Sequence, residues 1–415
     1  MNDGSTPAGQ RGIGGFAGAT LVALICGSAI LMISLGIRHS FGLFLQPASL
    51  QHGWGRETFG FAIAIQNLVW GVSQPFVGML ADRFGATRLT LASAVLYAGG
   101  LAIMAQVADP VVFVFGTGVI IGLALAGASF SVIFGTISRL VEPEKRSLAL
   151  GITASVGSFG QFAILPLALV LIEALGWQGT LLVYAAMCLL LVPLALGLRE
   201  DGVAAASGPG LRAMDALREA FAMRDFWLLT FGFFACGFQV VFIGTHLPAY
   251  LADKGIASSV AVTVLALIGL FNIAGTYYSG VLGGRMRKPM LLVWIYIARA
   301  IAIAAFVLMP VSALSAYIFG MVIGLLWLST VPLTNGTVSS VWGVKNMSML
   351  GGIVFFSHQM GSFLGSWLGG LLYDVTGNYN IAWGIAIGVS LLAAALNWPI
   401  SERSVAQRQA AAAPG

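Results

Sequence analysis

Long apolar stretches alternate with short polar segments along almost the whole chain, and twelve of these stretches have the length of a membrane-crossing helix. A helix of roughly 20 apolar residues crosses about 30 Å of hydrocarbon. The pattern therefore predicts an all-α membrane protein with twelve transmembrane helices. We place the approximate spans at residues 16–47, 57–80, 88–107, 111–139, 147–173, 178–198, 226–251, 258–284, 290–309, 312–338, 347–372 and 380–400.

One long polar segment, residues 199–225, divides the twelve spans into two sets of six. It combines charged residues with alanine, serine, glycine and proline, so it does not continue the apolar pattern on either side. We predict an N-terminal six-helix bundle at 16–198 and a C-terminal six-helix bundle at 226–400, joined by this linker. Polar tails at 1–15 and 401–415 flank the bundles.

Basic residues outside the spans are distributed very unevenly between the two sides of the predicted membrane. With both termini on one side, that side holds sixteen lysines and arginines, and the opposite side holds Arg56 and Lys254 alone. Positively charged loops stay in the cytoplasm. We therefore expect a multi-pass protein of a bacterial inner membrane with both termini cytoplasmic. Topology explains the net charge of +5, so no nucleic-acid partner is expected.

The composition excludes an ordinary soluble protein. Apolar residues make up 58% of the chain and charged residues only 8%, whereas soluble globular domains carry about 25% charged residues. Fifty-four glycines would weaken helices in water, but in lipid they allow helices to approach closely, and Gly361, Gly365 and Gly369 have the spacing of such contacts. The three cysteines lie within predicted spans without the spacing of a disulfide or metal site, so no metal is expected.

A charged motif connects the second and third spans. It reads Gly78-x-x-x-Asp82-Arg83-x-Gly85-x-x-Arg88. A weaker copy, with Gly280 and Arg285 at the matching positions, follows 202 residues later between the eighth and ninth spans. Two parallel six-helix repeats of this kind form a common transporter architecture.

The motif resembles the signature loop of the major facilitator superfamily, and the resemblance extends over essentially the whole chain. It implies the major facilitator fold, in which two pseudo-symmetric six-helix bundles rock around a central site. In that family the loop acts as a gate on the cytoplasmic side. The resemblance therefore implies gating roles for Asp82, Arg83 and Arg88, and we extend this expectation to Arg285 in the weaker copy.

Further segments resemble the bacterial monocarboxylate-porter branch, which is related to oxalate–formate exchangers. They are Gly36-Ile-Arg38-His39-Ser-Phe-Gly42-Leu-Phe-Leu-Gln-Pro47, Ser357-His358-Gln359-x-Gly361-Ser-Phe-x-Gly365 and Tyr373-Asp374-x-Thr376-Gly377. A cation in the first helix binds substrate in several such proteins, and Arg38 occupies a comparable place. The chain departs from the branch in the eighth span, where an arginine is common but Asn272 stands. It departs again in the eleventh span, where His358 stands in place of the lysine of some relatives.

Two cations, Arg38 and Arg299, fall inside predicted spans, while no carboxylate lies near the centre of any span. An ionised group at that depth persists mainly where a water-filled cavity or a partner receives it. A positive cavity attracts anions, and an arginine can hold a carboxylate through two parallel hydrogen bonds. We therefore predict that Arg38 binds an organic anion. Arg299 lies in a helix that is peripheral in the resembled family, where it either pairs with a backbone carbonyl or reaches the membrane surface.

Polar residues in the other spans are the remaining site candidates. We predict that His358 and Gln359 complete the substrate site from the second half. Secondary candidates are Gln66, Asn67, Gln161, Gln239 and Asn272. Each of these could instead make an interhelical hydrogen bond. His358 and His246 are the candidates for proton coupling, because histidine exchanges protons near neutral pH.

The sequence predicts a secondary active transporter of a small organic anion, with a monocarboxylate favoured, that works by alternating access. Either proton symport or anion exchange could drive it. The sequence has no nucleotide-binding loop and no plausible nucleophile–base pair, so we expect no enzyme activity and no cofactor. We expect a monomer in the bilayer. The alternatives are an efflux carrier for neutral or amphipathic compounds and a membrane sensor that keeps a transporter fold without flux.

Overall fold

The structure, a computed structural model, describes residues 18–54, 56–199, 213–405 and 407. The first half consists of α1 (Gly18–His39), η2 (Ser40–Phe44), α2 (Leu45–His52), α3 (Arg56–Phe84), α4 (Ala86–Gln106), α5 (Pro110–Val114), η3 (Phe115–Ile120), α6 (Ile121–Gly127), α7 (Phe130–Leu140), α8 (Pro143–Leu189) and α9 (Leu191–Leu196). The second half consists of α10 (Ala213–Ala222), α11 (Arg224–Asp253), α12 (Ser258–Gly283), α13 (Lys288–Leu308), α14 (Ala313–Leu326), α15 (Thr330–Trp342), α16 (Met347–Thr376) and α17 (Asn380–Asn397).

These helices account for the twelve predicted spans, although several spans contain more than one helix. The first span consists of α1, η2 and α2, the fourth of α5 to α7, and the tenth of α14 and α15. The fifth span and most of the sixth lie in α8, where Gly176 interrupts the helical backbone with a φ of 71°. The all-α class and the twelve-helix architecture are therefore confirmed.

Ten stretches of the described chain are long and apolar enough to cross a membrane by length and hydropathy alone. The two remaining spans are α3 and α16, whose apolar sequences are interrupted by polar residues such as Gln66, Gln74 and His358. These two helices pack against each other across the two halves of the molecule. The least apolar spans therefore meet in the interior, where their polar side chains find partners.

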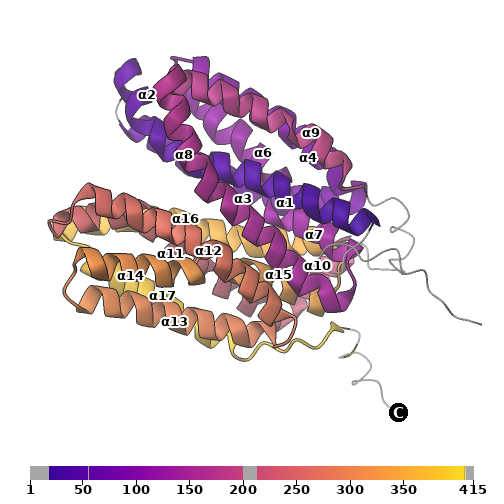
Figure 1. Cartoon of the computed structure of the whole chain (residues 1–415). Helices are drawn as coiled ribbons and strands as arrows, with labels where there is room; N and C mark the ends of the chain where they lie inside the picture. The colour runs from indigo at the N-terminus through magenta and orange to yellow at the C-terminus, as the bar shows by residue number, and fades with distance from the viewer. Residues whose placement is uncertain (1–17, 55, 200–212, 406, 408–415) are drawn as a thin grey trace, which may run out of the picture.

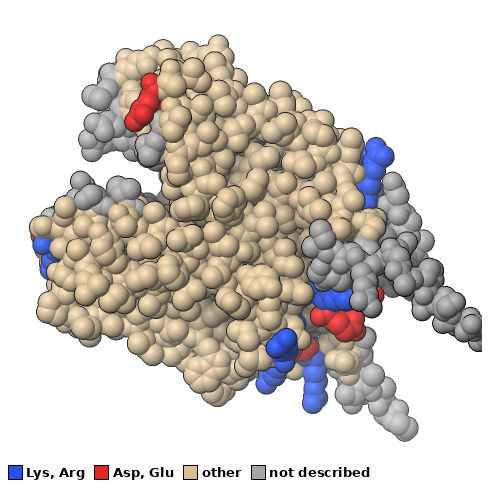
Figure 2. Space-filling view, in the orientation of Figure 1, with Lys and Arg blue, Asp and Glu red and all other residues tan. Residues whose placement is uncertain are grey.

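The two halves form two helical bundles that converge at one end and separate at the other (Figure 1). We name the converging end, at which α17 finishes, the closed side, and the opposite end the open side. On the open side the space-filling view has a notch between the halves (Figure 2). Charged side chains gather mainly on the closed side, and the flank in this view is mostly uncharged (Figure 2), as expected of a surface that faces lipid.

Two helix pairs make most of the contacts between the halves: α3 with α16, and α8 with α12. Glycines bring the backbones of each pair into contact. A Cβ on Gly78 would lie 2.2 Å from the carbonyl oxygen of Ser348, and one on Gly280 would lie 2.4 Å from the Cα of Gly151. Both distances are shorter than real Cβ contacts, so only glycine permits these approaches. Gly78 and Gly280 are 202 positions apart, in agreement with the internal repeat.

Each half also contains a break in a membrane-spanning helix, at 128–129 between α6 and α7 and at 327–329 between α14 and α15. A break leaves backbone carbonyls without helical partners. In the first half, the hydroxyl of Ser34 donates to the carbonyl of Ala128 (3.1 Å), and the hydroxyl of Tyr97 donates to the carbonyl of Ser34 (3.1 Å). Neutral side chains therefore support the break in the first half.

Candidate functional site

Arg38 lies in the last turn of α1, immediately before the 3₁₀ turn η2. The carbonyl end of a helix favours a cation. The Nη2 of Arg38 donates to Oδ1 of Asn67 in α3 (3.2 Å), and the guanidinium carbon lies 5.7 Å from the centre of the Phe41 ring. Its Nε is buried without a hydrogen-bond partner among the described residues. None of the ion pairs in the described part of the chain involves Arg38, so no described carboxylate compensates its charge.

Asn67 connects Arg38 to the two predicted site residues of α16. The Nε2 of Gln359 donates to the backbone carbonyl of Asn67 (3.4 Å), and the Oε1 of Gln359 lies 3.2 Å from Nδ1 of His358. Both α16 side chains are buried. We name Arg38, Asn67, Gln359 and His358 the polar bridge, because together they link the two halves. The structure thus joins three predicted site residues through a fourth that the sequence indicated only as a secondary contact.

The polar bridge lies towards the open side within the α3–α16 pair, because Asn67 stands fifteen residues before Asp82 in α3. The next contact towards the closed side is aromatic: the rings of Trp70 and Phe355 have centroids 5.1 Å apart. Gly71 provides space for Gln359, because a Cβ on that glycine would lie 2.7 Å from the Cβ of Gln359. The bridge therefore lies on the open side of a tightly packed part of the α3–α16 interface.

Asn272 and Gln161 lie on the other helix pair that joins the halves. Asn272, in α12, is fully buried. Its Oδ1 accepts from the backbone N–H of Leu328 (3.0 Å), and its Nδ2 donates to Oγ of Ser158 in α8 (2.9 Å). Gln161, in α8, is half-buried, and no hydrogen bond joins it to another described residue. Asn272 therefore supports the break after α14 and bonds the halves, while the amide of Gln161 is free for other contacts.

Gln239 and Arg299 form a buried cluster inside the second half. The Nη1 of Arg299 donates to Oε1 of Gln239 (3.2 Å), and Nε2 of Gln239 donates to the carbonyl of Ala386 (2.8 Å). The guanidinium also donates to the carbonyls of Leu326 and Trp327, at the end of α14. Pairing of Arg299 with backbone carbonyls is thus confirmed. Both ends of the Gln239 amide bond residues of the second half, and no described hydrogen bond connects it to the first half, so we leave Gln239 out of the proposed site.

The internal repeat explains the position of Arg299. Arg299 and Cys236 stand 202 residues after Tyr97 and Ser34, which support the helix break of the first half. Nη2 of Arg299 lies 3.7 Å from the sulfur of Cys236, so the equivalent residues are again in contact. In the second half the cation bonds the carbonyls of the break itself, whereas in the first half the equivalent tyrosine bonds the carbonyl of Ser34, whose hydroxyl bonds the break.

His246 lies in α11, away from the closed side. Its Nδ1 is 3.4 Å from the hydroxyl of Tyr379, and its ring centroid is 5.6 Å from that of Phe242. Gly369 of α16 makes room for the ring, because a Cβ there would lie 2.5 Å from it. His246 thus packs within the second half, and its role in proton coupling stays a prediction.

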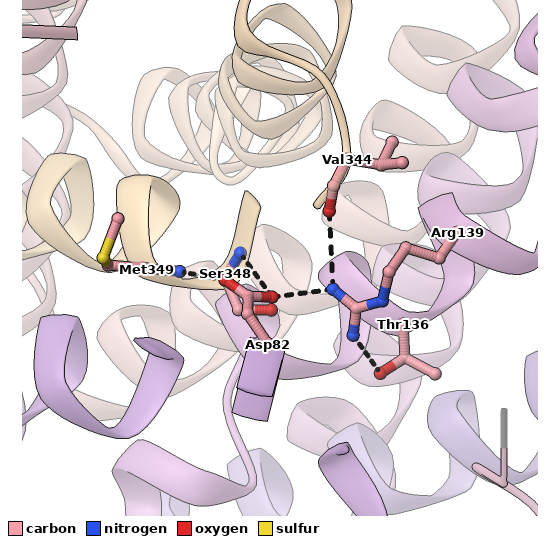
Figure 3. Close-up of polar contacts among 6 residues, drawn as sticks. All are labelled: Asp82, Thr136, Arg139, Val344, Ser348 and Met349. Atoms are coloured by element: carbon pink, nitrogen blue, oxygen red, sulfur yellow. Dashed lines mark hydrogen bonds and ion pairs between the residues drawn. The ribbon is translucent and has the colours of Figure 1, made fainter. Parts of the chain in front are cut away.

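On the closed side, Asp82 of α3 bonds the two halves together (Figure 3). Its Oδ1 accepts from Nη1 of Arg139 in α7 (2.7 Å), and the two side chains are only 4% and 9% exposed. Its carboxylate also accepts from the backbone N–H groups of Ser348 (3.3 Å) and Met349 (2.8 Å), in the first turn of α16. A carboxylate is stabilised at this position by the helix dipole and by the free N–H groups.

Arg139 extends the same network. Its Nη2 donates to Oγ1 of Thr136 (3.3 Å), and its Nη1 lies 3.5 Å from the carbonyl of Val344, in the segment that precedes α16 (Figure 3). Arg139 therefore contacts the second half directly as well as through Asp82.

The arginines predicted to form the gate lie outside this network. Arg83, Arg88 and Arg285 are exposed, and no ion pair joins them to Asp82 in the described part of the chain. Their gating roles stay predictions. The arginine that pairs with Asp82 is instead Arg139, 57 positions away, and no motif spacing pointed to that pair.

Comparison with known proteins gives one family and several relatives. The profile described as Major Facilitator Superfamily matches residues 15–357. The chain is 26% identical over 366 residues to the uncharacterized MFS-type transporter YcxA of Bacillus subtilis, covering 82% of this chain and 85% of that protein. It is 27% identical to monocarboxylate transporter 13 of Bos taurus (92% and 88% covered) and 22% identical to the oxalate:formate antiporter of Oxalobacter formigenes (92% and 91% covered).

Solved structures share the fold at low sequence identity. The fucose:proton symporter FucP of E. coli superposes with a TM-score of 0.70 at 14% identity, over 92% of this chain and all of the other. A structure of FucP described as being in the outward conformation gives a TM-score of 0.69 at 15% identity, with the same coverage of both chains. At this identity, the likeness shows the fold alone.

Proposed function

This chain belongs to the Major Facilitator Superfamily, and on that premise we propose that it transports a small organic anion, with a monocarboxylate as the favoured substrate. Its family and relatives are transporters, so the prediction of a transporter rather than an enzyme is confirmed. We propose alternating access, in which the bundles at 16–198 and 226–400 rock around the polar bridge.

One observation carries the choice of an anion. The guanidinium of Arg38 bonds Asn67, the residue that contacts the second half, and this described partner offers an amide oxygen rather than a carboxylate. Electrostatic attraction is strong where water is scarce, and a guanidinium matches the geometry of a carboxylate. Two relatives are named for monocarboxylates and for oxalate and formate, which supports the same class of substrate.

The proposed site draws on both halves. Arg38 comes from the first half, and Gln359 and His358 come from the second; Gln161 and Asn272 are further candidates on the α8–α12 pair. A substrate that contacts both halves can bind two states with different affinity, which is the requirement for shifting their populations. Proton symport and anion exchange both suit this site. They differ in whether a pH gradient alone drives uptake, and His358 is the protonatable residue nearest to Arg38 in the bridge.

We also propose the orientation that the basic residues predict, with both termini in the cytoplasm of a bacterial inner membrane. The closed side is then cytoplasmic, and the structure corresponds to an outward-open state. The cytoplasmic gate would comprise Asp82 with Arg139, and Arg83, Arg88 and Arg285 around it. One chain contains both halves of the site, so we expect a monomer.

Counterflow of labelled lactate, acetate and oxalate in proteoliposomes tests the proposal. We expect Arg38→Ala to lower kcat/KM for the transported acid by roughly 10- to 100-fold, since hydrogen bonds to a charged group are lost. Arg38→Lys should retain part of the activity, because it keeps the charge without the two-point geometry. Arg218→Ala is the matched control, because this arginine is exposed on α10, outside the site.

Three outcomes contradict the proposal. Equal flux of the acid in the wild type and in Arg38→Ala removes Arg38 from the site. Flux of a labelled neutral solute, without flux of any acid, supports an efflux carrier for neutral compounds. The absence of all counterflow in a folded protein supports a sensor.

A further inference from the structure

Asn67 stands between the guanidinium of Arg38 and the second half of the protein. Its Oδ1 accepts from Nη2 of Arg38 (3.2 Å), and its Nδ2 donates to the carbonyl of Ile63 one turn earlier in α3 (3.1 Å). The bond to Ile63 fixes the amide so that its oxygen faces Arg38. The backbone carbonyl of Asn67 accepts from Gln359 (3.4 Å). One residue therefore contacts both the cation and the opposite half.

The amide oxygen occupies an edge of the guanidinium that suits a carboxylate. Nε and Nη2 of an arginine lie side by side and can donate in parallel to the two oxygens of one carboxylate. In Arg38, Nη2 donates to the amide oxygen of Asn67, while Nε is buried without a described hydrogen-bond partner. One donor of this two-point edge thus bonds a neutral acceptor, and the other has no hydrogen-bond partner among the described residues.

A carboxylate would compete successfully for this edge. Charge-assisted hydrogen bonds are shorter and roughly twice as strong as bonds between neutral groups. A carboxylate also satisfies both donors, whereas the single oxygen of Asn67 satisfies one. Satisfying a buried donor that otherwise lacks a partner adds a further gain in free energy.

We propose, on the basis of the proposed function, that the amide oxygen of Asn67 holds the place of the substrate carboxylate in the empty site. Substrate binding displaces it from Arg38. Asn67 therefore competes with the substrate and sets its affinity. The backbone carbonyl of the same residue accepts the hydrogen bond from Gln359, so the displacement takes place next to the contact between α3 and α16.

Asn67→Ala tests this role through the sign of its effect. Removing the competing oxygen should lower the KM for lactate counterflow by about fivefold, the factor that one neutral hydrogen bond is worth. The kcat should not rise, because alanine keeps the backbone carbonyl that accepts from Gln359 and so leaves the α3–α16 contact in place. A residue that simply contacted the substrate would show the opposite change, a higher KM.

Asn67→Asp tests the same edge from the other direction. The new carboxylate has the size of the amide and should pair permanently with Arg38, so we expect the KM for lactate to rise by roughly 30-fold or more. Leu68→Ala is the control for this part of α3, because Leu68 is 39% exposed and lies outside the bridge. Its KM should equal that of the wild type.

A binding measurement that needs no turnover makes the test independent of transport. The lactate-induced rise in unfolding temperature should be larger in Asn67→Ala than in the wild type, and absent in Asn67→Asp. An unchanged or higher KM in a stably folded Asn67→Ala, with Arg38→Ala still impaired, overturns the role of Asn67 alone. Full activity of Arg38→Ala overturns the proposed function instead.

Discussion

The two interfaces that hold the halves together follow the same plan but use different forces. In the α3–α16 interface, Gly78 allows backbone contact, and Asp82 on the next turn accepts two backbone N–H groups of α16. In the α8–α12 interface, Gly280 makes an equally close contact, but the position equivalent to Asp82 is Gly284, 202 residues later. One interface combines packing with charge, and the other combines packing with neutral hydrogen bonds such as that between Asn272 and Ser158.

This difference assigns the interfaces different energetic roles. Breaking a buried ion pair leaves an uncompensated charge and costs about 3–5 kcal/mol. Backbones that meet at glycines separate without stranding a charge, and small-residue contacts in lipid depend on van der Waals packing. We therefore expect the α3–α16 interface to set the free energy of opening on the closed side, and the α8–α12 interface to act as the pivot.

The largest expected effect comes from removing the charge of Asp82. Asp82→Asn keeps the size of the side chain but leaves Arg139 without its carboxylate in a buried position. We expect the closed side to lose about 3 kcal/mol of stabilisation and lactate counterflow to fall at least tenfold, because the open and closed states are no longer balanced. Hydrogen exchange at the amides of Ser348 and Met349 measures the loosening directly, since both donate to Asp82.

The control for this variant is an acid in an exposed ion pair. Asp215 lies 4.0 Å from Arg218, with side chains 47% and 79% exposed, and such pairs contribute little to stability. Asp215→Asn should leave both flux and amide exchange unchanged. If Asp82→Asn also left the exchange of the two amides unchanged, the charged interface would not differ in strength from the glycine interface.

The glycine interface is expected to respond to size rather than to charge. In Gly151→Ala, the new Cβ would lie 2.6 Å from the Cα of Gly280, so the helices must move apart. Overpacking of this kind costs roughly 1–3 kcal/mol, and counterflow should fall by a smaller factor than in Asp82→Asn. Gly269→Ala is the matched control in α12, because its nearest neighbour, the Cβ of Phe162, would be 4.0 Å away. Equal loss in both variants would mean that glycine acts through helix flexibility instead of contact.

The sequence was sufficient for the fold because hydrophobicity and charge in a membrane protein follow simple physical limits. The length of each apolar stretch predicts a span, and the uneven distribution of basic residues assigns the loops to the two sides of the predicted membrane. The same reasoning identified Asp82, since topology gives no reason for an acid in that loop. It also identified Arg38, Gln359 and His358, which the structure joins in one polar bridge.

Other features depend on contacts between distant parts of the chain, which a single sequence does not encode locally. Asp82 bonds Met349, 267 positions away, and no spacing rule connects them. The helix break after α14 contains no proline or charge, although Pro332 follows in the first turn of α15. It is supported by Arg299, 27 and 28 positions from the carbonyls that it binds. The polar interruptions of α3 and α16 were visible, but that these two helices face each other was not.

The smallest expected effect comes from making the two interfaces alike. Gly284→Asp places a carboxylate at the position equivalent to Asp82, beside the start of α8. The backbone of Gly284 is helical (φ −79°, ψ −18°), and the nearest atom to a new Cβ would be 3.4 Å away, so the side chain fits. An anion near a helix N-terminus is worth roughly 0.3–1 kcal/mol, so opening of the closed side should slow about two- to fivefold.

The control is Gly284→Asn, which has the same shape without the charge and should open at the wild-type rate. If Asn slowed counterflow as much as Asp, flexibility at Gly284 would matter more than the missing charge, and the contrast between the interfaces would be one of backbone mobility.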